Sequence, residues 1–200
     1  GSVSVPETAA PKSGTKNIKL ILHTQADLLN FFPELSGLIN ELIQNKQLDL
    51  IKKTVKMPGL YHKGDIYVYP SRLDGIGLTI AEAISCGLPL ITSDNPPMNE
   101  FAQCHGSELI TIERLFARRD GYYWPQCRVD VHDLSKIMKK FADNPEKIPQ
   151  LSSSARSYAI EKLDWERNSK KLTEILQNSE RISSAPRLLE QATTFDNRKY

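Results

Sequence analysis

Two carboxylates and a short glycine-bearing loop are the residues of this sequence best suited to chemistry. Asp74 lies in the loop 71–79 (SRLDGIGLT), and Glu82 follows it eight positions later. An ionised carboxylate has two acceptor oxygens and can hold two neighbouring hydroxyl groups at once. We therefore expect the pair to bind two polyol groups. The alternative is that Glu82 is an ordinary solvated helix residue.

The loop itself is suited to an anion. Gly75 and Gly77 let backbone N–H groups approach a ligand closely, and a helix that begins beside them adds the positive end of its dipole. Arg72 can neutralise a phosphate there, or it is an ordinary surface arginine. The spacing is not the dinucleotide fingerprint GxGxxG, because Ile80 occupies the third glycine position, and no Gly-Lys-Ser/Thr of a Walker loop follows.

The surrounding sequence predicts the elements that position this loop. Residues 65–69 (DIYVY) read as a strand, 78–86 as a helix that ends at Gly87, and 88–92 as a second buried strand. A strand, helix and strand in so few residues predict a right-handed parallel crossover. Ligands bind such sheets at the carboxyl ends of the strands, where Asp94 and Asn95 also lie.

The rest of the chain continues this alternation, which predicts an α/β fold with a Rossmann-like parallel sheet flanked by helices. The aromatic run 122–125 (YYWP) is expected to cover a sheet edge, with stacking on a base as the alternative. Further strands are expected at 18–22, 48–55 and 108–112, and helices at 28–43 (interrupted near Pro33 and Gly37), 60–62, 130–143, 148–163 and 165–176.

We expect one Rossmann-like domain at 18–178, between a flexible tail or linker at 1–17 and a carboxy-terminal tail at 179–200 with a short helix near 188–192. The 26 basic residues nearly balance the 24 acidic ones, which argues against a nucleic-acid binder. Apolar runs are too short to span a bilayer. The three cysteines lack a CxxC pairing, so we expect no metal and a cytoplasmic setting. The Gly-Ser start suggests an excised piece of a longer protein.

Several stretches together resemble a known family. They are Leu60-Tyr61, 65–71 (DIYVYPS), 74–78 (DGIGL), Glu82-Ala83, 87–91 (GLPLI) and 95–101 (NPPMNEF). Over about forty contiguous residues they are similar to the carboxy-terminal half of the group 1 family of retaining glycosyltransferases, which have the GT-B fold.

The resemblance implies roles for individual residues. The family's Glu-x7-Glu motif falls on Asp74 and Glu82, where the first acid lies at the donor sugar and the second holds the ribose. The first acid is here one methylene shorter than in the family. The amides that follow it serve the sugar and the diphosphate, and the loop 56–58 cradles the base. The implied donor-binding residues are therefore Gly75, Ile76, Gly77, Leu78 and Met57, with no metal ion or other cofactor.

The resemblance implies a domain that binds a nucleoside-diphosphate sugar for retaining hexosyl transfer to an unknown acceptor. The acceptor-binding amino-terminal GT-B half is missing from these residues, and this half alone is expected to be weakly active or inactive. The alternative is a non-catalytic scaffold or interaction domain. An unrelated flavodoxin-like domain would leave the run 95–100 (NPPMNE) unexplained.

Overall fold

The computed structural model describes residues 18–56, 59–119 and 121–179. The chain divides into two compact units, Gly1–Leu163 and Asp164–Tyr200. The first unit holds every strand of the described residues, and the described part of the second is the helix α6 (Trp165–Asn178). Within the described ranges, no helix combines the length and apolar character needed to cross a membrane.

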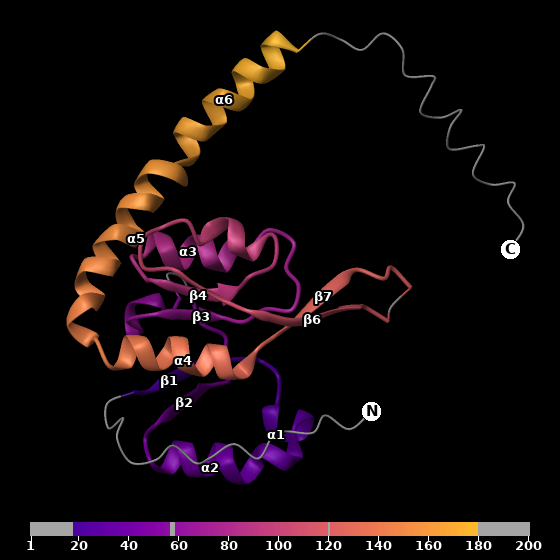
Figure 1. Ribbon diagram of the computed structural model, residues 1–200, viewed down its shortest axis with the longest axis vertical. Coiled ribbons are helices and arrows are strands. Elements are labelled where there is room, and N and C mark those ends of the chain that lie inside the picture. The colour runs from indigo at the N-terminus through magenta and orange to yellow at the C-terminus, as the bar shows by residue number, and fades with distance from the viewer. Residues whose placement is uncertain (1–17, 57–58, 120, 180–200) are drawn as a thin grey trace, which may run out of the picture. The chain divides into compact units, whose positions relative to one another are not determined.

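A three-stranded parallel sheet forms the centre of the first unit (Figure 1). Its strands are β3 (Tyr67–Tyr69), β4 (Leu90–Ser93) and β5 (Glu108–Ile110), in the order β3-β4-β5. All four residues of β4 are buried, as expected for the central strand of a parallel sheet. The helix α3 (Leu78–Ser85) connects β3 to β4, so the predicted crossover is confirmed.

Helices cover both faces of this sheet. The alternation of β4 sends Leu90 into a core formed with α3 and α5 (Ile148–Lys162), where Ile80 and Ala155 are fully buried. The next residue, Ile91, packs instead with Phe141 of α4 (Val131–Ala142). The predicted α/β architecture, a parallel sheet flanked by helices, is therefore confirmed.

The amino-terminal part forms a second parallel pair. Strand β1 (Leu20–His23) pairs with β2 (Leu48–Ile51), and α1 (Leu28–Phe31), the 3-10 turn η1 (Pro33–Leu35) and α2 (Ser36–Gln44) connect them. The predicted division into a short turn and a longer helix is confirmed, but Gly37 lies inside α2 and does not interrupt it. Strand β2 is shorter than the predicted 48–55.

The segment after β5 differs from the prediction. Strands β6 (Ile112–Ala117) and β7 (Pro125–Val129) form an antiparallel hairpin. The expectation that the run 122–125 covers a sheet edge is wrong, because Tyr122, Tyr123 and Trp124 are 78%, 71% and 55% exposed. Pairing of β6 with β7 places these residues in the turn of the hairpin, where no strand lies beneath them.

Short 3-10 helices complete the described chain. They are η2 (Tyr61–Lys63), where a helical turn was predicted, η3 (Met98–Phe101), which follows Pro96-Pro97, and η4 (Pro145–Lys147) before α5. The predicted helices at 130–143, 148–163 and 165–176 correspond to α4, α5 and α6. The predicted tail 1–17 and the helix near 188–192 lie outside the described residues.

Candidate functional site

Asp74 organises the loop between β3 and α3. One carboxylate oxygen, Oδ1, accepts hydrogen bonds from the amides of Ile76 (3.0 Å) and Gly77 (2.7 Å). The other oxygen, Oδ2, accepts a hydrogen bond from the hydroxyl group of Tyr69, with the two oxygens 2.5 Å apart. Gly77 lies at φ 77°, a left-handed conformation that favours glycine, and leads directly into α3. Asp74 thus fixes the path of the backbone at the start of this helix.

These contacts shift the pKa values of both Asp74 and Tyr69. The hydrogen bond from Tyr69, followed by the amide of Gly77, holds the pKa of Asp74 below its usual value of 3.8. Burial, followed by the same bond to Asp74, raises the pKa of Tyr69 above its usual 10.0. At neutral pH the aspartate is therefore ionised and the phenol remains a hydrogen-bond donor.

Glu82, like Asp74, accepts a hydrogen bond from a tyrosine hydroxyl. It lies exposed on α3, and the hydroxyl of Tyr61 donates to its Oε2 at 2.6 Å. Burial, and then the bond to Glu82, raises the pKa of Tyr61 well above its usual range, so the phenol keeps its proton. An exposed carboxylate oriented by one donor can still accept hydrogen bonds from a ligand hydroxyl pair.

A row of three tyrosine rings joins the two acids. Tyr67 stacks against Tyr69 with ring centroids 5.8 Å apart and planes 15° apart. On its other side Tyr67 meets Tyr61 edge-on, at 5.8 Å and 67°. Sequence reasoning missed this row, although Tyr67 and Tyr69 are two apart in a strand and therefore share one face.

The first two carbonyl groups of the loop accept hydrogen bonds from residues that are distant in the sequence. The hydroxyl of Ser93, at the end of β4, donates to the carbonyl of Ser71 at 2.7 Å. In β7, the thiol of Cys127 donates to the same carbonyl at 3.3 Å, and its amide donates to the carbonyl of Arg72 at 2.9 Å. Ser93 and Cys127 are fully buried. No sequence signal predicts these contacts, because Cys127 lies 56 residues after Ser71.

The structure brings most of the predicted site residues to one place. The loop and the adjoining helix α3 carry Asp74 and Glu82, together with the predicted donor-binding residues. Of those, Gly77 is buried, whereas Arg72, Gly75, Ile76 and Leu78 are exposed. Met57, the predicted base-binding residue, lies outside the described residues.

Other polar candidates have internal partners. His23, the last residue of β1, shares a hydrogen bond with the carbonyl of Lys53 at 3.1 Å. The amide side chain of Asn99 donates to Asp94, and that of Asn95 donates to the carbonyl of Pro96. Among the described residues, no three or more His, Cys, Asp or Glu side chains gather in a way that could hold a metal ion.

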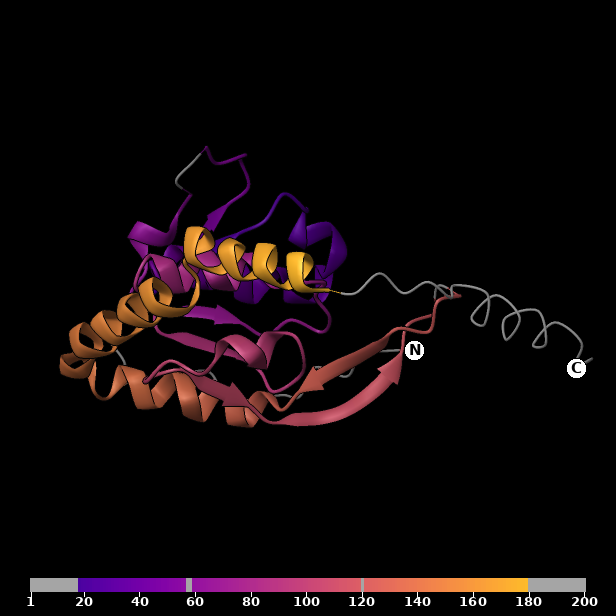
Figure 2. The same ribbon diagram turned by 90° about the horizontal axis from the view of Figure 1, so that it is seen from above.

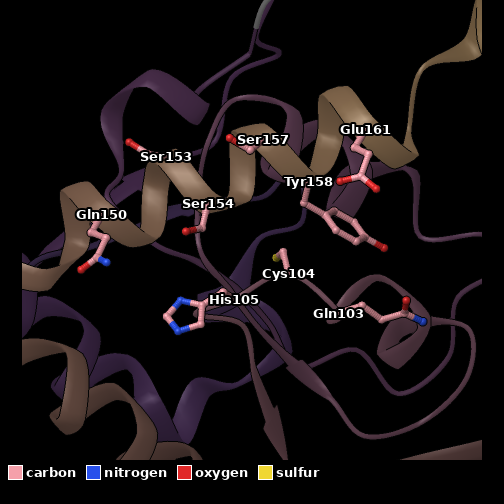
Figure 3. Close-up of a pocket in the computed structure, with 9 residues that line it drawn as sticks. All are labelled: Gln103, Cys104, His105, Gln150, Ser153, Ser154, Ser157, Tyr158 and Glu161. Atoms are coloured by element: carbon pink, nitrogen blue, oxygen red, sulfur yellow. The ribbon is translucent and has the colours of Figure 1, made fainter.

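A separate open cavity of about 420 Å³ lies along α5 (Figure 3). Ser153, Ser154 and Ser157 line one side of it, and Cys104 and His105 line the other. The cavity shares no lining residue with the loop that carries Asp74. Cys104 is buried, and its sulfur lies 2.7 Å from the hydroxyl oxygen of Ser107. We therefore assign the candidate donor site to the loop and α3.

Comparison with known proteins identifies the family of this chain. Residues 29–158 match the family described as glycosyl transferases group 1. The chain is 25% identical over 111 residues to an uncharacterised glycosyltransferase of Sulfolobus islandicus rod-shaped virus 1. This match covers 52% of this chain and 33% of that protein. It is 33% identical over 109 residues to the GtfA subunit of a UDP-N-acetylglucosamine–peptide N-acetylglucosaminyltransferase of Streptococcus parasanguinis, covering 54% and 17%.

Solved structures share the fold at low sequence identity. The crystal structure of HepE from Anabaena in complex with UDP superposes with a TM-score of 0.62 at 19% identity, over 81% of this chain and 41% of that one. Sucrose-phosphate synthase from Thermosynechococcus elongatus gives 0.59 at 17% identity, over 80% and 38%. The chain thus spans less than half of these structures and a third or less of the two curated relatives. Because the family match covers most of the described residues, this chain belongs to the group 1 glycosyltransferases and has the fold of the carboxy-terminal half of a GT-B enzyme.

Proposed function

We propose that this chain is the donor-binding half of a glycosyltransferase and binds a nucleoside-diphosphate sugar at the Asp74 loop and Glu82. The main observation behind the proposal is that the exposed carboxylate of Glu82 accepts a hydrogen bond from the phenol of Tyr61. Glu82 lies on α3, and this helix begins directly after the glycine-bearing loop. The carboxylate provides acceptors for a ribose diol, and the helix start favours the diphosphate.

Asp74 has a structural part in this proposal. Because it binds the amides of Ile76 and Gly77, it preforms the turn on which the sugar and diphosphate would lie. A preformed turn lowers the ordering cost of binding. The exposed Arg72 adds a positive charge within the loop.

The chemistry proposed for the whole enzyme is retaining hexosyl transfer to an acceptor held by the other GT-B half. The positive charge that develops on the sugar would form between the two halves, where positioning and electrostatic stabilisation supply the rate. We propose that no metal ion takes part. UDP is the first nucleotide to test, since the relatives GtfA and HepE carry UDP in their names or bound states.

Calorimetric titration of the 200-residue chain with UDP, GDP and ADP tests the donor site. We expect one nucleotide to bind with a Kd of about 1 mM or tighter. Glu82→Gln should weaken this binding about tenfold, since a hydrogen bond to a charged group contributes about 1.5 kcal/mol. The exposed Glu146, in η4, provides a matched control as Glu146→Gln and should bind as the wild type does.

Two results would count against the proposal. One is the absence of binding by all three nucleotides in a sample whose circular dichroism shows a folded chain. The other is an equal loss of affinity in Glu82→Gln and Glu146→Gln, which would show that charge in general, and not the Glu82 carboxylate, determines binding.

A second candidate function is a non-catalytic interaction domain. It is favoured by one observation: both oxygens of Asp74 already accept hydrogen bonds within the chain. The variant Asp74→Glu restores the longer acid of the family. If this variant binds a UDP-sugar no more tightly than it binds UDP, the sugar contributes no contact to binding. That result would favour the interaction domain.

A further inference from the structure

The β6-β7 hairpin presents a concentrated set of large exposed side chains. Tyr122, Tyr123 and Trp124 in its turn are 78%, 71% and 55% exposed, and Leu115 in β6 is 62% exposed. The two strands run side by side as a long antiparallel pair (Figure 2). Exposed aromatic and aliphatic side chains gathered on one element are typical of an interaction surface.

The same hairpin is rich in arginine. Residues 112–129 contain four arginines and two acids, Glu113 and Asp120. Arg114 lies directly opposite Arg128 in the strand register, and the Arg114 guanidinium lies 5.8 Å from the centre of the Phe116 ring. Like charges directly opposite each other destabilise a strand pair. An anionic partner that contacts both guanidinium groups would offset this repulsion.

The turn also holds an aromatic residue in an unfavourable backbone conformation. Tyr123 has φ 53°, in the left-handed region that a bulky residue rarely adopts. The hydrogen bond from the Arg118 amide to the Trp124 carbonyl (2.9 Å) closes the turn around it. Glycine would be the less strained residue at this position, so packing inside the chain does not explain the tyrosine, whose side chain is 71% exposed.

We propose that the β6-β7 hairpin docks the protein on an anionic phospholipid bilayer. Tyrosine and tryptophan rings prefer the boundary between headgroups and acyl chains, and arginines near the surface are attracted to anionic headgroups. A nucleic acid would be expected to select a basic groove and a strong basic excess, whereas this chain has a net charge of +2. The proposal does not depend on donor binding.

Cosedimentation with vesicles tests the charge requirement. The 200-residue chain should bind vesicles of phosphatidylcholine and phosphatidylglycerol, and bind phosphatidylcholine alone much more weakly. The double variant Arg114→Gln/Arg128→Gln should bind the anionic vesicles about 30-fold more weakly, since each basic residue near the surface contributes about a fivefold change. Lys53→Gln/Lys136→Gln removes two exposed charges elsewhere and should lose much less affinity.

Tryptophan fluorescence tests the location of the contact, because the chain has two tryptophans, Trp124 in the hairpin and Trp165 in α6. In a Trp165→Phe chain, the emission of Trp124 should shift to shorter wavelength on anionic vesicles. In a Trp124→Phe chain, the emission of Trp165 should stay unchanged. A shift of Trp165 alone would assign the contact to α6 and overturn the proposal.

A further variant separates the effect on binding from an effect on folding. Tyr123→Gly removes the strained backbone position, so the hairpin should remain formed while vesicle affinity falls. Unchanged affinity in this variant and in Arg114→Gln/Arg128→Gln would overturn the proposal. So would equal binding to neutral and anionic vesicles, or preferential binding to a single-stranded oligonucleotide.

Discussion

Each predicted acid of this site is oriented by a tyrosine hydroxyl, and the tyrosines are oriented by one another. Tyr69 holds Asp74, Tyr61 holds Glu82, and the ring of Tyr67 packs between them. The raised pKa values of Tyr61 and Tyr69 keep both phenols protonated and able to donate. Both phenols therefore remain hydrogen-bond donors to the acids across the neutral range.

The first prediction concerns Tyr61. In Tyr61→Phe the ring remains, but the Glu82 carboxylate loses the donor that fixes its rotamer. We expect nucleotide affinity to fall about fivefold, equivalent to about 1 kcal/mol for one hydrogen bond at an exposed site. Calorimetry measures the change. Tyr158→Phe, beside the separate cavity along α5, is the control, and an equal effect in both variants would contradict the assigned role.

The second prediction concerns acid stability. The pKa of Asp74 is lower in the folded chain than its usual 3.8, so its ionised form is favoured by folding. This contribution is present above pH 3.8 and is lost as the pH falls through the lower folded value. Denaturant unfolding should show Asp74→Asn less stable than the wild type at neutral pH. The difference should shrink in strong acid, and a constant difference would contradict the prediction.

The two acids could be predicted from the sequence, but the residues that hydrogen-bond to the acids and to the loop could not. Asp74 and Glu82 lie in one short segment, so their spacing and the loop glycines were visible directly. The contacts that hold this segment come from farther away: Tyr61 lies 21 residues before Glu82, and Cys127 lies 56 residues after Ser71. Pairing over such distances depends on the tertiary fold, which local patterns do not specify.

At the scale of elements, local pattern determined what was predictable. The β3-α3-β4 unit was expected because the continuous apolar run of β4 and the helical spacing of the apolar residues on α3 are both visible within the segment. The β6-β7 hairpin was missed because most residues of β6 are exposed and because the hairpin is defined by cross-strand pairing, with a register shift between Ile112 and Arg114. Its aromatic turn was consequently mistaken for a cover of the sheet.

The third prediction concerns the start of α3. A Cβ on Gly77 would lie 3.4 Å from side-chain carbons of Ile80 and Phe101, at a left-handed φ of 77°. Gly77→Ala should therefore lower the free energy of unfolding by about 1–2 kcal/mol and weaken nucleotide binding. Thermal denaturation and calorimetry measure the two effects.

Gly75 provides the matched control for this prediction. A Cβ there meets no atom within 4 Å, so Gly75→Ala should leave stability nearly unchanged. If both alanine variants were equally stable, the left-handed turn at Gly77 would not be a requirement of the loop.

At the scale of the whole molecule, the chain contains two units that differ in how many buried residues they hold. Unit Gly1–Leu163 contains the buried clusters around β4, whereas α6 in the second unit has no buried residue among those described. Hydrophobic burial is the dominant favourable contribution to folding. The stability measured for the chain should therefore belong to the first unit.

The fourth prediction follows from this division. A chain ending at Leu163 should unfold cooperatively at nearly the same temperature as the 200-residue chain. Differential scanning calorimetry measures both transitions. Loss of the cooperative transition on truncation would show that α6 contributes to the core of the first unit.

The backbone hydrogen bond from Cys127 to Arg72 links the two surfaces discussed above. The amide proton of this bond belongs to Cys127, a fully buried residue of the hairpin, and the acceptor is a carbonyl of the loop that carries Asp74. Exchange of such a proton with deuterium requires the two segments to separate locally. The exchange rate at Cys127 would therefore report on both events: a nucleotide that rigidifies the loop and a bilayer that immobilises the hairpin should each slow the same proton.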